Sequence, residues 1–307
     1  MEPGRAYRPP LGPVRRGIRE LGLALITIGV IILLFVGYQL WGTGFAERHS
    51  QATLKRGFEA AVVASSGDNP TVGTAGTGNQ SSQSPALSGA IDHMVIPRIK
   101  LDKYVVQGVA EQDLQQGPGH YPQTPLPGQD GNAAIAGHRT TYGAPFFDLN
   151  ELSVGDPIYL TDTAGMTFTY KVSEPPKVVS PSDTAVLDNT PFPELTLTTC
   201  NPRFSATSRL VVVARLTGRP PLPVTHPANV APVAAAVDNL GSGNRAAWPP
   251  AIAYGALVAL LWVGVRILIN RKRRWARLAA YVAGIGVCLV PLWFCFENVV
   301  RLLPQNI

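Results

Sequence analysis

The sequence has few cysteines, and their positions leave no disulfide framework. There are three in 307 residues. Cys288 and Cys295 lie in one long apolar run near the C-terminus, where we expect them to pack as small apolar groups. Cys200 stands alone outside that run. It is therefore a buried inert thiol, half of a bridge between chains, or a reactive nucleophile.

Several other features are missing from the sequence. It has no internal repeat, no phosphate-binding glycine loop and no tight acidic cluster of the kind that holds calcium. We therefore expect neither a cofactor nor a metal site.

The excess of basic residues does not indicate a nucleic-acid partner, because the charge is confined to two places. Residues 1–20 carry five arginines against two glutamates, and residues 270–277 carry five basic groups and no acid. Between them, residues 42–249 hold 14 basic and 17 acidic side chains. The central region is thus slightly acidic, and we expect no nucleic acid to bind it.

Three apolar runs are long enough to cross a bilayer, which takes about 20 residues. They cover 21–41, 251–269 and 278–297. The first is too long, and lacks a small-residue cleavage site, to be a removable signal peptide, so we interpret it as an anchor. Both basic clusters flank these runs. The positive-inside rule then places the N-terminus in the cytoplasm and the central region outside the cell, in a multi-pass protein of the cell membrane.

Composition divides the rest of the chain. Ala60–Ala90 has no aromatic residue and is rich in small polar ones, which is typical of a flexible tether, and the segment after Thr217 is rich in proline, which is typical of a semi-stiff spacer. The predicted organisation is a cytoplasmic basic tail (1–20), a transmembrane helix (21–41), a flexible extracellular tether (42–90), a catalytic β-barrel (91–217), a Pro-rich linker (218–250), a transmembrane helix (251–269), a cytoplasmic basic loop (270–277), a transmembrane helix (278–297) and a short extracellular tail (298–307).

Short β-like runs dominate the predicted domain. In 166–172, Phe168, Tyr170 and Val172 alternate with polar residues, which is the period of a half-buried strand. Pro-Gly and Asp-Gly pairs separate the runs and indicate turns. The fold class is therefore all-β, a closed or nearly closed barrel without exposed edges. The runs are 94–99, 104–109, 133–137, 157–160, 166–172, 195–199 and 209–216.

Cys200 ends a β run and precedes Asn201-Pro202, so its side chain should emerge at the rim of a sheet. A thiol needs a base or a cation nearby to act as a nucleophile. His138 also follows a β run and is the better candidate for the base, with His120 in a turn-rich segment as the other. Arg209 begins the last run and could supply a cation, but spacing alone does not separate it from two other arginines, Arg203 and Arg215.

Three motifs occur together around this cysteine: GHRTTYGAPF (137–146), TLTTC (196–200) and SRLVV (208–212). The set resembles the sortase family, and the first motif is most similar to class E sortases of actinobacteria. The resemblance implies an eight-stranded sortase β-barrel in which Cys200, His138 and Arg209 are catalytic. It also implies substrate-binding roles for Thr199, just before the cysteine, and for Tyr121.

The activity implied by the resemblance is cysteine transpeptidation. The enzyme would cleave an LAXTG- or LPXTG-type sorting signal between Thr and Gly, hold the protein as a thioester on Cys200, and transfer it to the amine of a lipid-linked peptidoglycan precursor. A pilus-assembling role is less favoured, because residues 60–90 contain no aspartate-aromatic lid motif.

Two other readings stay open. Other exported Cys–His enzymes include L,D-transpeptidases, which usually show a Ser-x-Gly-Cys context that is absent here, and papain-like peptidases, which place the cysteine before the histidine. Alternatively, the barrel is a non-catalytic binding module of a membrane complex with Cys200 merely buried.

Overall fold

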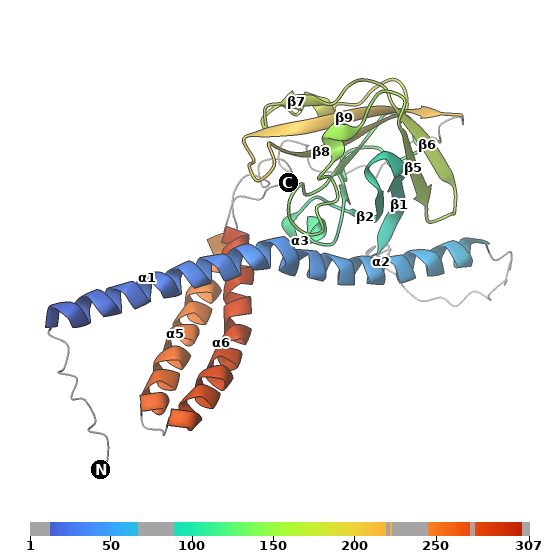
Figure 1. Ribbon diagram of the computed structural model, residues 1–307. Coiled ribbons are helices and arrows are strands. Elements are labelled where there is room, and N and C mark those ends of the chain that lie inside the picture. The colour runs from blue at the N-terminus through green and yellow to red at the C-terminus, as the bar shows by residue number, and fades with distance from the viewer. Residues whose placement is uncertain (1–12, 67–88, 219–221, 223–244, 271–273, 303–307) are drawn as a thin grey trace, which may run out of the picture.

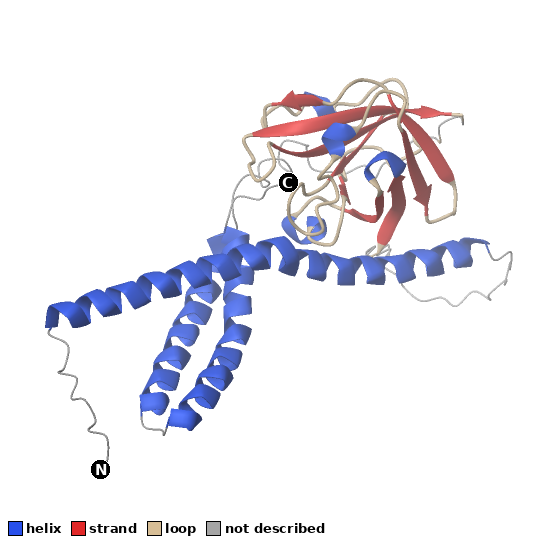
Figure 2. Cartoon of the chain, in the orientation of Figure 1, coloured by secondary structure: helices blue, strands red, loops and turns tan. Residues whose placement is uncertain are grey.

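The computed structural model describes residues 13–66, 89–218, 222, 245–270 and 274–302. It consists of a β-barrel, a long N-terminal helical rod and a C-terminal helical hairpin (Figures 1 and 2). The helices are α1 (Pro13–Gly37), α2 (Thr43–Ser66), α3 (Glu111–Leu114), α5 (Trp248–Asn270) and α6 (Arg274–Leu302), and a π-helical turn, η1 (Tyr38–Gly42), joins α1 to α2.

The barrel closes on itself through eight strands. Their order is β6-β5-β1-β2-β3-β4-β8-β9, and pairing of β9 with β6 closes the barrel. A ninth strand, β7, pairs with the first part of β9, whereas β6 pairs with its last part. The strands are β1 (Ala90–Ile96), β2 (Leu101–Gln107), β3 (Gly119–His120), β4 (Asn132–Ala136), β5 (Pro157–Asp162), β6 (Thr167–Val172), β7 (Lys177–Val179), β8 (Glu194–Asn201) and β9 (Ser208–Thr217). The predicted eight-stranded barrel is confirmed.

Alternation along β8 separates the barrel core from a second apolar cluster. Leu195 and Leu197 are fully buried in the main core with Phe168 and Tyr170. Cys200 points to the other face, because successive strand residues alternate between faces. There it belongs to a smaller cluster, whose members are Val109, Leu114, Tyr121, Ala134, Ala136, Leu187 and Cys200.

The region predicted as a tether contains a helix. Residues 43–66 form α2, so the prediction of a flexible segment was wrong there, and residues 67–88 lie outside the described part of the chain. The helix packs Leu54 and Phe58 against Tyr104 and Val106 of β2. These contacts are with residues about 50 positions away, so local composition did not reveal them.

Gln51 fixes the position of α2 with three hydrogen bonds. Its amide nitrogen donates to Tyr104 O at 2.9 Å and to Gln116 O at 2.8 Å, and its Oε1 accepts from Tyr104 N at 2.8 Å. A buried side chain that satisfies both donor and acceptor groups specifies one register of the helix on the strand. The helix is therefore an integral part of the barrel domain.

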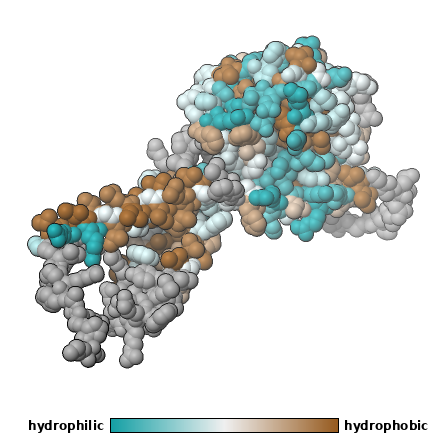
Figure 3. Space-filling view, viewed as in Figure 1, coloured by the Kyte–Doolittle hydropathy of each residue, from teal (hydrophilic) through white to brown (hydrophobic). Residues whose placement is uncertain are grey.

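Three helices are long and apolar enough to span a membrane. The candidate spans are Pro13–Gly37, Trp248–Val265 and Ala283–Val300. They match the three predicted apolar runs, although α1 begins at Pro13 and so includes part of the predicted tail. Figure 3 shows apolar surface along the helices and a more polar barrel.

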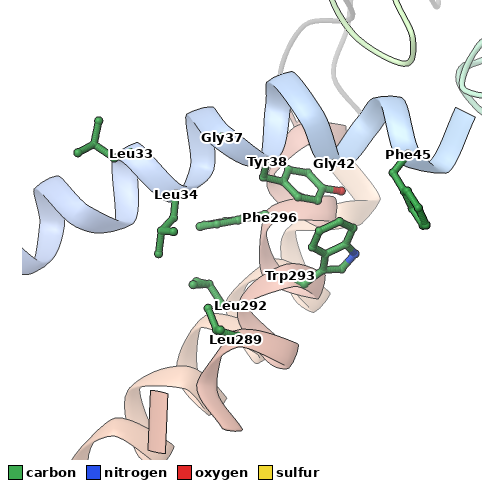
Figure 4. A pocket seen from close by; sticks show the side chains of 10 residues that line it. All are labelled: Leu33, Leu34, Gly37, Tyr38, Gly42, Phe45, Leu289, Leu292, Trp293 and Phe296. Carbon is green, nitrogen blue, oxygen red and sulfur yellow. The ribbon is translucent and has the colours of Figure 1, made fainter. Parts of the chain in front are cut away.

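A groove lies where the N-terminal rod crosses α6. Its lining is mostly apolar, and Figure 4 shows the side chains, from Leu33, Leu34, Gly37, Tyr38, Gly42, Phe45, Leu289, Leu292, Trp293 and Phe296. The ring of Tyr38 meets Trp293 edge-on, with 4.7 Å between centroids. Aromatic packing thus joins α6 to the turn between α1 and α2.

The predicted Pro-rich linker begins with a contact to the barrel. Leu222 N donates to Gly128 O at 2.8 Å, and Asp130 N donates to Leu222 O at 3.3 Å. Apart from Leu222, residues 219–244 of that linker lie outside the described part of the chain, so its predicted stiffness stays a prediction.

Candidate active site

Cys200 and Arg209 are paired across β8 and β9. They are opposite each other in the antiparallel register, and Arg209 Nη1 lies 3.3 Å from Cys200 Sγ. The same nitrogen is 3.3 Å from the carbonyl oxygens of Ala206 and Ser208, in and just after the turn between the strands. The hairpin therefore holds the guanidinium over the thiol.

The other two arginines have different partners. Arg203 pairs with Asp148 at 2.9 Å and lies over the Phe147 ring at 4.0 Å. Arg215 lies 3.9 Å from Glu194 and 4.3 Å from the Phe192 ring centroid. Of the three arginines that sequence spacing left equivalent, Arg209 is the one in contact with the thiol.

His138 follows β4, which runs parallel to β8. Ala136 is opposite Thr198, and Gly137 N donates to Thr198 O at 3.1 Å. Extending this register by two residues places His138 alongside Cys200. The histidine is 1% exposed, and its ring lies 5.1 Å from that of Tyr142. The structure thus brings the three predicted catalytic residues to one end of the barrel.

Arg139 was missed as a site residue in the sequence. It is 5% exposed, and its Nη1 donates to Cys200 O at 3.0 Å and to Asn201 Oδ1 at 2.6 Å. Its Nη2 donates to Asn150 Oδ1 at 2.9 Å. The guanidinium therefore ties the residue after His138 to the backbone of Cys200 and to the side chain of Asn201. An arginine directly after the candidate histidine was the signal available in the sequence.

His120, the other histidine candidate, has a structural role. Its Nε2 lies 2.8 Å from Pro125 O and 3.2 Å from Thr124 Oγ1, and its Nδ1 lies 3.2 Å from Gln107 Oε1. These contacts secure the turn after β3.

Thr199 and Tyr121 differ in where they point. Thr199 shares the inner face of β8 with Leu197, and its hydroxyl donates to Gly137 O at 2.7 Å. Tyr121 lies in the cluster of Cys200, with its hydroxyl 3.4 Å from Thr198 Oγ1. Tyr121 therefore faces the side of the sheet that carries the thiol, whereas Thr199 holds the strand leading to His138.

Comparisons with known proteins identify the family of this chain. A family model described as "Sortase domain" matches residues 94–217. Sortase D of Bacillus subtilis is 30% identical over 185 residues, covering 60% of this chain and 89% of that protein. Sortase SrtE1 of Streptomyces coelicolor is 34% identical over 227 residues, covering 69% of this chain and 60% of that protein. The chain belongs to the sortase family.

The E-type relatives agree with the predicted resemblance to class E. The chain spans 60% of the length of SrtE1. Among solved structures, a T196V mutant of sortase E from Streptomyces avermitilis is 38% identical, with a TM-score of 0.39, covering 42% of this chain and 88% of that one.

The thiol of this sortase is held mainly in its neutral form. Burial raises the pKa of Cys200 to about 11, while the positive charges of Arg209 and Arg139 act in the opposite direction. Desolvation disfavours the thiolate, so the two guanidiniums reduce a penalty that would otherwise be larger. The thiolate is therefore the minor species at neutral pH.

A groove in this sortase runs beside the thiol, between the segment after β7 and the outer face of β8 and β9. Its wall includes Arg209, opposite Cys200 on β9, Thr198, two residues before Cys200 on β8, and Tyr121. Burial raises the pKa of Tyr121, so its hydroxyl remains a neutral hydrogen-bonding group. The complete lining is Tyr121, Val179, Pro181, Asp183, Thr184, Val186, Leu187, Thr198, Arg209 and Val211.

The wall of this groove has mostly apolar side chains, and the charged ones among its lining residues are Asp183 and Arg209. In the parts of the chain that the structure describes, no group of three or more His, Cys, Asp or Glu side chains is placed to hold a metal ion.

Proposed function

We propose that this sortase is a membrane-anchored cysteine transpeptidase with Cys200, His138 and Arg209 as its catalytic residues. The observation that carries the proposal is the 3.3 Å contact between Arg209 Nη1 and Cys200 Sγ, made where the β4–β8 register brings His138 alongside. A nucleophile, a proton carrier and a fixed cation are the three groups that acyl transfer needs.

In the first half-reaction, Cys200 passes its thiol proton to His138, which becomes the imidazolium, and Sγ attacks the Thr carbonyl carbon of the Thr–Gly bond in the sorting signal. The C–S bond forms and the oxygen becomes an oxyanion, to which the Arg209 guanidinium donates hydrogen bonds. The C–N bond then breaks, and the glycine amine leaves with a proton from the His138 imidazolium. The product is a thioester on Cys200.

In the second half-reaction, an amine attacks the thioester. A new C–N bond forms, the C–S bond breaks, and His138 takes the proton that the attacking amine loses. We propose the amine of a lipid-linked cell-wall precursor as this acceptor. The substrate is then a protein with an LAXTG- or LPXTG-type signal, which becomes joined to the wall.

We assign the groove beside Cys200 to the sorting signal. Tyr121 contributes a hydroxyl to its wall and lies in the same cluster as the thiol, which supports a role in selecting the residue before the Thr-Gly bond. Thr199 acts through Gly137 O, so its proposed contribution to substrate binding is to set the position of the neighbouring Cys200 and His138 backbone.

We propose that the barrel lies outside the cell, with the N-terminus and the α5–α6 connection in the cytoplasm. The basic residues cluster at those two places. In Figure 1 the barrel lies near the start of α5 and the end of α6, whereas the end of α5 and the start of α6 lie away from it, which supports this orientation.

The test is intact-mass spectrometry of the full-length protein in detergent micelles, incubated with LAXTG and LPXTG peptides. We expect a thioester-sized mass on the wild type, absent from Cys200→Ala, and its discharge by a glycine-based amine into a ligated peptide. Cleavage without ligation would identify a peptidase instead. Folded protein with no adduct and no cleavage would favour the binding-module reading.

A further inference from the structure

Helix α2 reaches the loop that follows His138. Thr43, the first residue of α2, is 2% exposed. Its Oγ1 accepts a hydrogen bond from Tyr142 N at 3.2 Å and donates one to Gln39 O at 2.7 Å. One hydroxyl thus joins the turn after α1 to the loop after His138.

This loop has a strained backbone. Tyr142 has a φ of 47° and Ala144 a φ of 45°, with Gly143 between them at 73°. Left-handed backbone is unfavourable for side chains other than glycine, and it persists where the surroundings fix it. Within the loop, Ala144 N donates to Thr141 O at 2.8 Å and Phe146 N donates to His138 O at 3.1 Å. The hydrogen bond from Tyr142 N to Thr43 supports the loop from outside.

Glu47, one helical turn after Thr43, packs on the same loop. It is fully buried, and its Oε1 lies 2.6 Å from Lys103 Nζ. A Cβ atom at Gly143 would collide with the Glu47 carboxylate. Helix α2 therefore contacts two consecutive residues of the loop with two consecutive turns, and glycine is required at Gly143 by both its φ and its close neighbour.

Tyr142, whose backbone Thr43 supports, packs on the imidazole of His138. The Tyr142 ring lies 5.1 Å from the His138 ring at an angle of 36°, and both side chains are buried. Since Tyr142 N is bonded to Thr43, the position of the tyrosine ring depends on α2. The ring of Tyr142, which α2 holds in place, therefore packs against the imidazole of His138.

Helix α6 packs on η1, the turn that precedes Thr43. Tyr38 and Gln39 belong to the π-helical turn η1, and Trp293 and Phe296 pack on Tyr38 with centroids at 4.7 and 5.9 Å (Figure 4). Gln39 O is the acceptor of the Thr43 hydroxyl. The C-terminal hairpin thus braces the turn from which Thr43 reaches the loop.

We propose that Thr43 is a positioning residue for His138: it holds the Tyr142 backbone so that the imidazole stays alongside Cys200. The residue touches neither the substrate nor the reacting atoms and acts through the loop. The inference rests on the proposed transpeptidase function, because turnover is its first readout.

The test compares three variants of the full-length protein in detergent micelles, with LAXTG and LPXTG peptides and a glycine-based amine. Thr43→Val keeps the side-chain shape and removes the acceptor, so we expect kcat to fall about 10-fold with KM within about twofold. Thr43→Ser keeps the hydroxyl and should stay within about twofold of the wild type. Thr53→Val is the matched control, because Thr53 is exposed on the same helix, where its hydroxyl donates to His49 O at 3.2 Å and accepts from Arg56 Nη2 at 3.4 Å, both within α2.

Wild-type turnover by Thr43→Val, or an equal loss in Thr43→Ser, would overturn the inference. If Thr43→Val lowers the melting temperature, Thr43→Ala replaces it, since it also lacks the acceptor but has no methyl groups to accommodate. A wild type that cleaves neither peptide would refute the proposed function. The rate of Cys200 alkylation by iodoacetamide then tests the positioning role of Thr43 by itself. Equal rates in the wild type and Thr43→Val would overturn positioning, and a slower rate in the variant supports it.

Discussion

Arg209 and Cys200 face each other across the last two strands of the barrel, with 3.3 Å between Nη1 and Sγ. In this position the guanidinium can lower the pKa of the thiol before substrate binds and can donate hydrogen bonds to the oxyanion after attack. The first effect changes the pH dependence of Cys200 reactivity, and the second changes kcat.

Removing Arg209 should cost turnover more than binding. We expect Arg209→Ala to lower kcat by about 10²–10³-fold, the range seen when an oxyanion donor is lost. Arg209→Lys should recover only part of this, because an ammonium lacks the fork of donors. Steady-state kinetics with the signal peptide measure both. Arg215→Ala is the control, since Arg215 is largely exposed and far along β9. Full activity in Arg209→Ala would contradict its assignment.

The reactivity of Cys200 should rise with pH over an unusually high range. Burial raises its pKa to about 11, so the thiolate fraction increases until well above neutral pH. Because the charge of Arg209 lowers this pKa, Arg209→Ala should move the profile to higher pH still. Iodoacetamide alkylation, followed at the Cys200 peptide by mass spectrometry, gives the profile. A thiol that is fully reactive at pH 7 would contradict this prediction.

Arg139 should matter for stability as well as for activity. Its loss leaves Cys200 O and Asn201 Oδ1 without their donor in a buried place, and an unsatisfied buried group costs about 1–3 kcal/mol. We expect Arg139→Gln to lower the melting temperature and to reduce turnover. Thermal unfolding monitored by circular dichroism checks the first effect. An unchanged melting temperature would show that solvent satisfies these acceptors.

The buried pair of Glu47 and Lys103 should make one variant sensitive to pH. Burial raises the pKa of Glu47, and Lys103 lowers it. Lys103→Gln removes that compensation and should lower the free energy of unfolding by about 2 kcal/mol at pH 7. The loss is smaller than for breaking a fully buried pair, because Lys103 is partly exposed. A carboxyl with a raised pKa favours folding when protonated, so the cost should shrink as the pH falls.

Urea unfolding at pH 5 and pH 7 measures this difference. The control is Lys55→Gln, which removes one partner of an exposed pair with Glu59, 3.8 Å apart, and should change stability little at either pH. An equal loss at both pH values for Lys103→Gln would mean that Glu47 is already neutral or well solvated in the variant.

The sequence was informative where neighbouring residues determine structure. All seven predicted β runs lie wholly or partly in strands, because side-chain alternation is a local signal. Strands β3 and β7 were not predicted, since two or three residues carry no period. Arg209 could not be singled out either, because the β8–β9 register and the aromatic partners of Arg203 and Arg215 are tertiary facts.

Helix α2 is the largest difference between expectation and structure. Its sequence is rich in small and charged residues and continues into a polar stretch without aromatic residues, so composition favoured a tether. What secures the helix is a row of contacts with β2, through Gln51, Leu54 and Phe58. Tertiary packing of this kind overrides local composition, and no pattern within the helix itself reveals its partner.

The continuity of α1, η1 and α2 has a consequence for how the enzyme meets its substrates. A barrel on a slack tether would sample many heights and orientations above the bilayer. Here α1, a candidate membrane span, runs directly into α2, which packs along the barrel (Figure 1). In the proposed topology the groove beside Cys200 therefore has a set distance and direction relative to the lipid surface, and the proposed substrate and acceptor have to reach it at that level.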